Sequence, residues 1–126
     1  AFSWKGERMN TYCAVYRLNP ERIDDYCTLH QNCWPDQLRA LREAGAQNLE
    51  IFLEGTLCII TYMCEDFDAF LEALSRSEVN RRWQAAMEGI FQSNTSLSGE
   101  DRIVPARKVF SLKDQLENSL TVDQRR

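Results

Sequence analysis

The sequence predicts an α+β protein whose strands and helices follow the order β-α-β-β-α-β, the ferredoxin-like arrangement. Two stretches alternate in side-chain character with a period of two, and a third is dense in β-branched and aromatic residues, as strands are. Other stretches carry apolar residues three and four positions apart, as helices with one buried face do. A length of 126 residues is enough for one domain with one core.

The first predicted strand is residues 11–18, where tyrosine and aliphatic side chains alternate. Asn19 and Pro20 then end the strand, because Asn suits the N-cap of a helix and Pro suits its first turn. The helix that begins here extends to Gln31 or Cys33.

Pro35 cannot continue that helix, because proline lacks the backbone donor and clashes with the preceding turn. We therefore expect a bend at Trp34 and a second helical stretch from Pro35 to just before Gly45, a suitable residue for the end of a helix. Leu38 and Leu41 form the predicted apolar side of this stretch.

A β-hairpin is predicted next. Residues 48–54 alternate again, Gly55 and Thr56 are typical of a tight turn, and residues 57–63 form the returning strand.

The second half of the predicted domain repeats the pattern of helices followed by a strand. One helix begins at Asp66 or Asp68, and another begins after Ser77 as its N-cap. Residues 92–102 are rich in small polar residues and predict a loop. Residues 108–112 predict a short final strand.

We expect one domain over residues 11–112, preceded by an N-terminal extension at 1–10 and followed by a polar tail at 113–126. The tail is predicted to be either a short helix or a disordered segment. The first ten residues are charged and contain no apolar run of the kind found in signal peptides.

The charge of the chain argues against two classes of partner. Its net charge is −4 and its pI is about 5.0, whereas nucleic acids and anionic membranes attract basic surfaces. No apolar run approaches the ~20 residues that cross a bilayer. We therefore expect neither a nucleic-acid partner nor a membrane partner.

The five cysteines include no Cys-x-x-Cys pair. We expect reduced, mostly buried thiols, which are typical of a cytoplasmic protein. Cys27, His30 and Cys33 have spacing that could suggest a metal. A separation of six residues on a helix turns Cys33 away from Cys27, however, and a structural zinc needs a fourth ligand. We therefore expect no metal.

Tyr26, His30 and Trp34 are spaced four residues apart, so a helix places them along one face. His30 is the sole histidine of the chain and can move a proton near neutral pH. We take His30 as a candidate acid/base, and Tyr26 and Trp34 as aromatic side chains that could line a small polyol site and hold a sugar ring. The same spacing also fits the core face of a helix, so a structural role stays open.

Helices would cover only one face of such a sheet. The other face would carry Tyr, Phe, Cys, Ile and Val side chains, which are unfavourable in water. Pairing of two sheets face to face buries them, so we expect a homodimer with a barrel-like core.

Four blocks of the sequence resemble the L-rhamnose mutarotase family, over about residues 12–112. The blocks are Asn19-Pro20…Tyr26-x-x-x-His30-x-x-x-Trp34-Pro35-x-x-Leu38, Gly45-Ala-x-Asn48-x-x-Ile51-x-Leu53, Glu78-Val79…Arg82-Trp83-x-x-x-Met87 and Val109-Phe110-Ser-Leu112. The first, helical block is the most specific.

This resemblance implies a dimeric α/β barrel that interconverts the α and β anomers of a 6-deoxy sugar such as L-rhamnose or L-fucose, without a cofactor. It implies that His30 is the proton donor, that Tyr26 binds the sugar and that Trp83 is the first of two adjacent tryptophans in contact with it. Leu49 stands where the family has a sugar-contacting tyrosine, and Gln84 stands where it has the second tryptophan. These two positions alter the expected substrate-binding set.

Two other functions stay open at this point. Dimeric α/β barrels also host cofactor-free monooxygenases and cyclases of aromatic compounds, and Leu49 makes the site more apolar. A partly altered sugar site also fits a non-catalytic sugar-binding protein. The retained acid/base residue favours the mutarotase over the binding protein.

Overall fold

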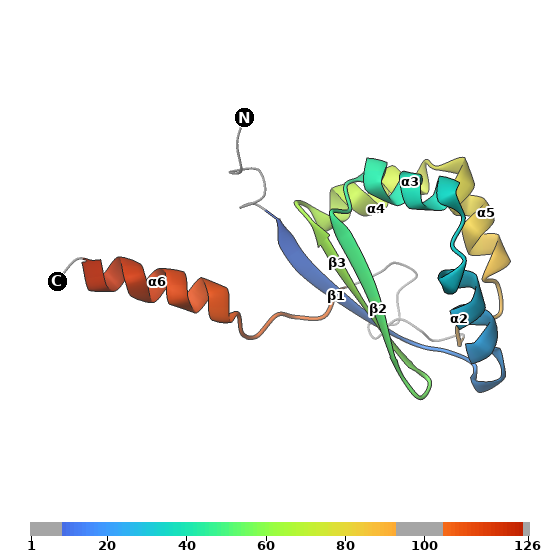
Figure 1. Cartoon of the computed structure of the whole chain (residues 1–126), viewed down its shortest axis with the longest axis horizontal. Coiled ribbons are helices and arrows are strands. Elements are labelled where there is room, and N and C mark those ends of the chain that lie inside the picture. The colour runs from blue at the N-terminus through green and yellow to red at the C-terminus, as the bar shows by residue number, and fades with distance from the viewer. Residues whose placement is uncertain (1–8, 93–104, 125–126) are drawn as a thin grey trace.

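The computed structural model describes residues 9–92 and 105–124, with side chains to residue 119 (Figure 1). Residues 1–8 of the expected N-terminal extension and most of the expected loop at 92–102 lie outside this part of the chain, and Asn10 of that extension already belongs to the first strand. The strands form an antiparallel sheet in the order β1-β3-β2, and they are β1 (Asn10–Arg17), β2 (Asn48–Glu54) and β3 (Leu57–Cys64).

The helices begin with a 3-10 turn, η1 (Pro20–Arg22). It is followed by α2 (Ile23–Gln31), α3 (Pro35–Ala44), α4 (Phe67–Ser75), α5 (Glu78–Ala86) and α6 (Leu112–Gln124). Helices α2 to α5 lie on one side of the sheet, whereas α6 extends away from it on the other side (Figure 1). The predicted α+β fold, with a helical layer on a sheet, is confirmed.

The central strand supplies much of the core. Cys58, Ile60 and Tyr62 of β3 are buried on the side that faces the helices, and they alternate with more exposed residues. The register places Ile60 between Ala14 of β1 and Ile51 of β2. The other face of the sheet therefore has no helical layer within residues 9–92.

The helix-start signals of the sequence are confirmed for α4 and α5. The Asp66 side chain accepts a hydrogen bond from Ala69 N at 3.0 Å, and Ser77 Oγ accepts one from Asn80 N at 3.2 Å. Both bonds satisfy backbone donors that the first helical turn leaves without partners. Pro35 begins α3 as predicted.

Asn19 lies at the N-cap position before Pro20, as predicted, but its side chain does not cap the helix. Its Nδ2 donates instead to Gly89 O at 2.8 Å and to Phe91 O at 3.4 Å. Asn19 thus ties the start of the first helical segment to the chain that follows α5.

The predicted apolar side of α3 is partly wrong. Leu41 packs against the core, but Leu38 is 55% exposed and Gln37 is only 1% exposed. Trp34 is extended, with φ −61° and ψ 134°, and Pro35 starts a new helix after it. The inward positions of α3 therefore do not continue the stripe of α2, and a glutamine takes an inward position.

The predicted strand at 108–112 is wrong. Residues 105–111 form no strand, although Ala106 N donates to Cys13 O of β1 at 2.6 Å. Ser111 instead starts a helix, because its Oγ accepts a hydrogen bond from Asp114 N at 3.2 Å. The polar tail is therefore helical to Gln124.

Candidate active site

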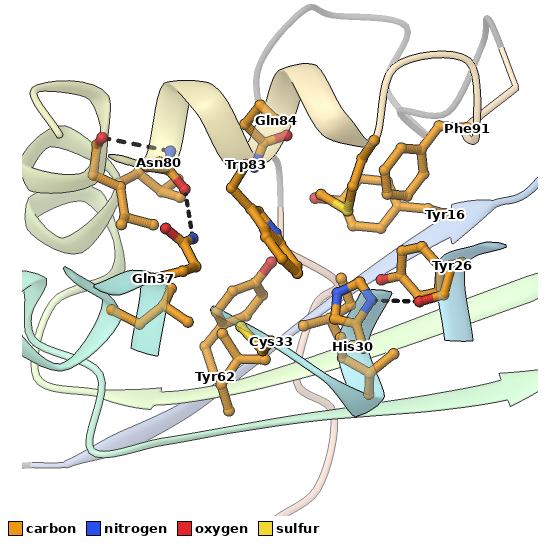
Figure 2. A pocket seen from close by; sticks show the side chains of 17 residues that line it. Tyr16, Tyr26, His30, Cys33, Gln37, Tyr62, Asn80, Trp83, Gln84 and Phe91 are labelled. Atoms are coloured by element: carbon orange, nitrogen blue, oxygen red, sulfur yellow. Dashed lines mark hydrogen bonds between the residues drawn. The ribbon is translucent and has the colours of Figure 1, made fainter. Parts of the chain in front are cut away.

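A cavity of about 280 Å³ lies between the sheet and the helices (Figure 2). This volume is just below the ~300–1,000 Å³ of pockets that hold drug-sized ligands, so it suits a smaller molecule. Most of its wall is aliphatic or aromatic. The polar side chains of the wall, apart from tyrosines and a cysteine, are His30, Gln37, Asn80 and Gln84.

His30 has a defined orientation in this wall. Its Nδ1 lies 2.8 Å from the backbone oxygen of Tyr26, one helical turn earlier. A carbonyl oxygen only accepts, so in the neutral ring Nδ1 carries the proton and Nε2 carries the lone pair. Burial lowers the pKa of His30 below its ordinary value of 6.5, and the hydrogen bond to Tyr26 O opposes this shift only in part. The ring is therefore neutral at pH 7 and Nε2 can accept a proton.

Tyr26 is buried beside His30, with 4.1 Å between the ring centroids. Its hydroxyl accepts a hydrogen bond from Cys58 Sγ at 3.3 Å, which leaves its own proton available for donation. Burial raises the pKa of Tyr26 far above its ordinary value. The hydroxyl thus stays protonated and can donate a hydrogen bond to a ligand.

The two candidate tryptophans differ in position. Trp83 is buried, lines the cavity and packs edge-on against His30, with 5.2 Å between the ring centroids. Trp34 is half-buried and packs edge-on against Trp83 at 5.1 Å, but it is not among the residues of the cavity wall. The structure therefore brings Tyr26, His30 and Trp83 together around the cavity and places Trp34 against Trp83.

Leu49 and Gln84 both line the cavity. Leu49 is half-buried on β2 and pairs across the sheet with Tyr62. Gln84 is exposed on α5, next to Trp83 in the sequence. Leu49 therefore belongs to the sheet wall, while Gln84 lies at the exposed edge of the site.

Two tyrosines of the sheet also line the cavity. Burial raises the pKa of Tyr16 to about 12 and raises that of Tyr62 as well, so both hydroxyls stay protonated. The alternation of the first strand predicts one sheet face for Tyr12 and Tyr16, with the dimer core favoured over the cavity, but the structure places Tyr16 in the cavity wall. Tyr62 was not predicted from the sequence.

The pair of amides formed by Gln37 and Asn80 was missed in the sequence. Gln37 Nε2 donates to Asn80 Oδ1 at 2.9 Å, across a gap of 43 residues in the chain. Since α3 and α5 form separate amphipathic patterns, only their packing brings these amides together.

The part of the chain that the structure describes contains no group of three His, Cys, Asp or Glu side chains placed to hold a metal ion. Cys27 and Cys33, the cysteines of the suspected metal motif, are free thiols, and Cys33 lines the cavity. Among the described helices, none has both the length and the apolar character needed to cross a membrane.

Comparison with known proteins assigns the family. A family model described as L-rhamnose mutarotase matches residues 11–112. The chain belongs to the L-rhamnose mutarotase family. Membership of this mutarotase family makes the chain an isomerase.

Relatives of the chain include several proteins named L-rhamnose mutarotase. The one from Shouchella clausii (strain KSM-K16) is 32% identical over 86 residues, which cover 67% of this chain and 82% of that protein. The one from Acidiphilium cryptum (strain JF-5) is 31% identical over 99 residues, which cover 76% of this chain and 91% of that protein. The one from Rhizobium meliloti (strain 1021) is 29% identical over 106 residues, which cover 83% of this chain and all of that protein.

The fold also matches a solved structure. The crystal structure of an L-rhamnose mutarotase from Formosa agariphila aligns with a TM-score of 0.64 and 19% sequence identity, covering 82% of this chain and 98% of that one. At this identity the similarity shows a shared fold, and it agrees with the ferredoxin-like domain expected of an L-rhamnose mutarotase family member.

Proposed function

We propose that this member of the family interconverts the α and β anomers of a 6-deoxyhexose such as L-rhamnose or L-fucose, with His30 as the acid/base and without a cofactor. The observation that carries the proposal is the His30 ring in the cavity wall, oriented by the Tyr26 carbonyl so that Nε2 can accept a proton. The names of the relatives support the class of sugar.

Anomer exchange needs one proton to leave the anomeric hydroxyl and another to reach the ring oxygen. Nε2 of neutral His30 accepts the proton of the anomeric hydroxyl, C1=O forms, and the bond between C1 and the ring oxygen breaks. The ring oxygen takes a proton, the C1–C2 bond rotates, and closure returns the protons in reverse. Positioned acid/base groups typically contribute ~10²–10⁴-fold to such steps.

The second proton carrier is best assigned to a water molecule. No Asp or Glu is among the described residues of the cavity wall. The raised pKa of Tyr26 disfavours loss of its proton. We therefore assign Tyr26 to a hydrogen bond with a sugar hydroxyl and leave the proton transfer to His30 and water.

The remaining candidate residues shape the binding surface. Trp83 supplies an aromatic face for the C–H groups of the sugar ring, and Trp34 holds Trp83 in place by edge-on packing. Leu49 contributes an apolar contact from the sheet, which suits the methyl group of a 6-deoxy sugar. Gln84 offers an amide to a hydroxyl at the exposed edge.

We also propose that two copies pair through the free face of the sheet. Val15, Ile59 and Phe52 form one row across the three strands, and Phe52 is 55% exposed. Val109 and Phe110 are also exposed. Helices α2 to α5 lie on the other side of the sheet (Figure 1), so a second copy would bury this row.

Saturation-transfer proton NMR of the anomeric signals of L-rhamnose and L-fucose tests the reaction. The wild-type protein should accelerate exchange of at least one sugar. His30→Ala should lower the acceleration by roughly 10²–10⁴-fold. Gln31→Ala is the matched control, because Gln31 is the exposed next residue of the same helix and should keep full activity.

The outcomes separate the candidate functions. Unchanged exchange in His30→Ala would remove His30 from the mechanism. If wild type accelerates neither sugar, the mutarotase proposal is rejected. Sugar binding without exchange would then point to a binding protein, and turnover of an aromatic compound would point to a monooxygenase or cyclase.

A further inference from the structure

Gln37 presents a buried acceptor that the protein does not satisfy. Its side chain is 1% exposed and its Nε2 donates to Asn80 Oδ1 at 2.9 Å. Its Oε1 is buried and receives no hydrogen bond from any described residue. A buried acceptor without a donor is unfavourable, so the group that fills the cavity is expected to supply a hydrogen bond to it.

The orientation of the amide follows from its partners. Asn80 Nδ2 donates to the backbone oxygen of Leu74 at 3.5 Å, a long bond to a group that can only accept. Asn80 therefore turns Oδ1 towards Gln37, and Gln37 in turn uses Nε2 for this contact. The chain of hydrogen bonds from Leu74 leaves Oε1 as the group without a partner.

The position of this acceptor relates it to the reaction. Gln37 lines the same cavity as His30. Figure 2 shows the Gln37 and Asn80 amides on one side of Trp83 and the His30 and Tyr26 rings on the other. A sugar with its anomeric carbon at His30 and its ring against Trp83 would thus reach Gln37 with a distant hydroxyl.

On the basis of the function proposed above, we propose that Gln37 Oε1 accepts a hydrogen bond from a sugar hydroxyl remote from the anomeric carbon, at C3 or C4. Gln37 is then a specificity-determining residue, and Asn80 is its positioning residue. A site built around a hydroxyl rejects an analogue that lacks it, because the buried acceptor is left without a donor. Leu49 and the other aliphatic wall residues cannot supply this discrimination.

The test is a double-mutant cycle between the protein and the sugar. Anomer exchange is measured by NMR for L-rhamnose and its 2-, 3- and 4-deoxy analogues, each as acceleration over the spontaneous rate. In wild type, removal of the 3- or the 4-hydroxyl should lower the acceleration roughly 5- to 100-fold. In Gln37→Leu, the acceleration of L-rhamnose exchange should itself fall by a similar factor. The deoxy analogue that is slower in wild type should then show no further loss of acceleration.

Three controls make the result specific. Removal of the 2-hydroxyl should change the acceleration by the same factor in wild type and in Gln37→Leu, because C2 adjoins the reacting carbon and its hydroxyl is not the one that Gln37 is proposed to bind. Gln31→Leu makes the same change at an exposed position and should leave every ratio unaltered. Asn80→Ala should shrink the same 3- or 4-deoxy penalty and spare the 2-deoxy penalty, which a merely structural role would not do.

Gln37→Met, with an unbranched side chain of similar length, replaces Gln37→Leu if the latter does not fold. Removing the 3- or 4-hydroxyl could still lower the acceleration in the Gln37 variants, or it could have no effect in wild type. In either case Gln37 does not recognise a hydroxyl, and the inference is overturned while the mutarotase proposal stands. If wild type accelerates no sugar, the proposed function fails and this inference fails with it.

Discussion

At the scale of the residue, the environment of His30 sets its protonation state. Burial disfavours the imidazolium form, and the carbonyl of Tyr26 fixes which nitrogen carries the proton of the neutral ring. The ring therefore stays uncharged at neutral pH while Nε2 keeps its lone pair. This is the state that a general base requires.

The lowered pKa of His30 predicts a loss of activity and of stability on the acid side. Below pH 6.5 the unfolded chain binds the proton more readily than the folded one, so folding stability falls as the pH drops from there towards the folded pKa. The exchange rate should fall over the same range, because protonation removes the base. Exchange rates measured between about pH 5 and 8 and the His30 Hε1 resonance, unique in a chain with one histidine, should give one midpoint below 6.5.

A different result would change the mechanism. If the rate rises as the pH falls from neutrality, the imidazolium is the active form and His30 acts first as an acid. If the resonance titrates and the rate does not follow it, another group limits the reaction.

At the scale of the element, the cap of α5 links stability to the site. Ser77 Oγ accepts a hydrogen bond from the backbone N of Asn80, which holds the first turn of the helix that carries Asn80 and Trp83. Without it, one backbone N–H in the first turn of the helix loses its partner. The cap therefore supports the element on which two wall residues depend.

Ser77→Ala should lower the free energy of unfolding by about 1 kcal/mol, because it removes the capping acceptor. Urea denaturation measures the change. Ser75→Ala is the matched control, since its hydroxyl donates to Glu72 O at the exposed end of α4 and the change should stay within about 0.5 kcal/mol. Equal losses in the two variants would mean that the Ser77 hydroxyl has no special role.

At the scale of the whole molecule, the two faces of the sheet explain the proposed dimer. One face packs against helices, and in the part of the chain that the structure describes the row of Val15, Ile59 and Phe52 on the other face has no helical layer. An apolar row of this kind is favourable only when another surface covers it. A second copy offers the same row and is therefore a self-complementary partner.

Phe52→Glu should convert the dimer into monomers, because it places a carboxylate in each half of an apolar interface, where an unpaired charge is strongly unfavourable. Size-exclusion chromatography with light scattering measures the mass in solution. Leu38→Glu is the control, since Leu38 is equally exposed, at 55%, but lies on α3 in the helical layer. A dimer that survives Phe52→Glu would exclude pairing through this face.

Much of the fold was predictable because its signals are local. Pro35, Asp66 and Ser77 start helices through their own backbone and side-chain chemistry, and the alternation of residues 48–54 is a property of the strand itself. The four-residue spacing of Tyr26 and His30 likewise predicted that they share one face of α2, and in the structure their rings are in contact.

Contacts between segments that are far apart in the sequence could not be predicted from local patterns, and only the tertiary structure shows them. The β propensity of residues 108–112 predicted a strand, but Ser111 caps a helix there and no described segment pairs with these residues. The apolar side chain of Leu38 led to the prediction that it faces the core. The bend at Trp34 instead turns Gln37 inward.

The sequence by itself therefore determined the order of the elements from β1 to α5 and the acid/base candidate, since each depends on residues within a few positions of one another, and its motifs indicated the family. Only the tertiary structure decided that Gln37 meets Asn80 and that Trp83, not Trp34, lines the cavity. The physical reason is that burial depends on how separate helices pack on the sheet, and no local pattern in the chain encodes that geometry.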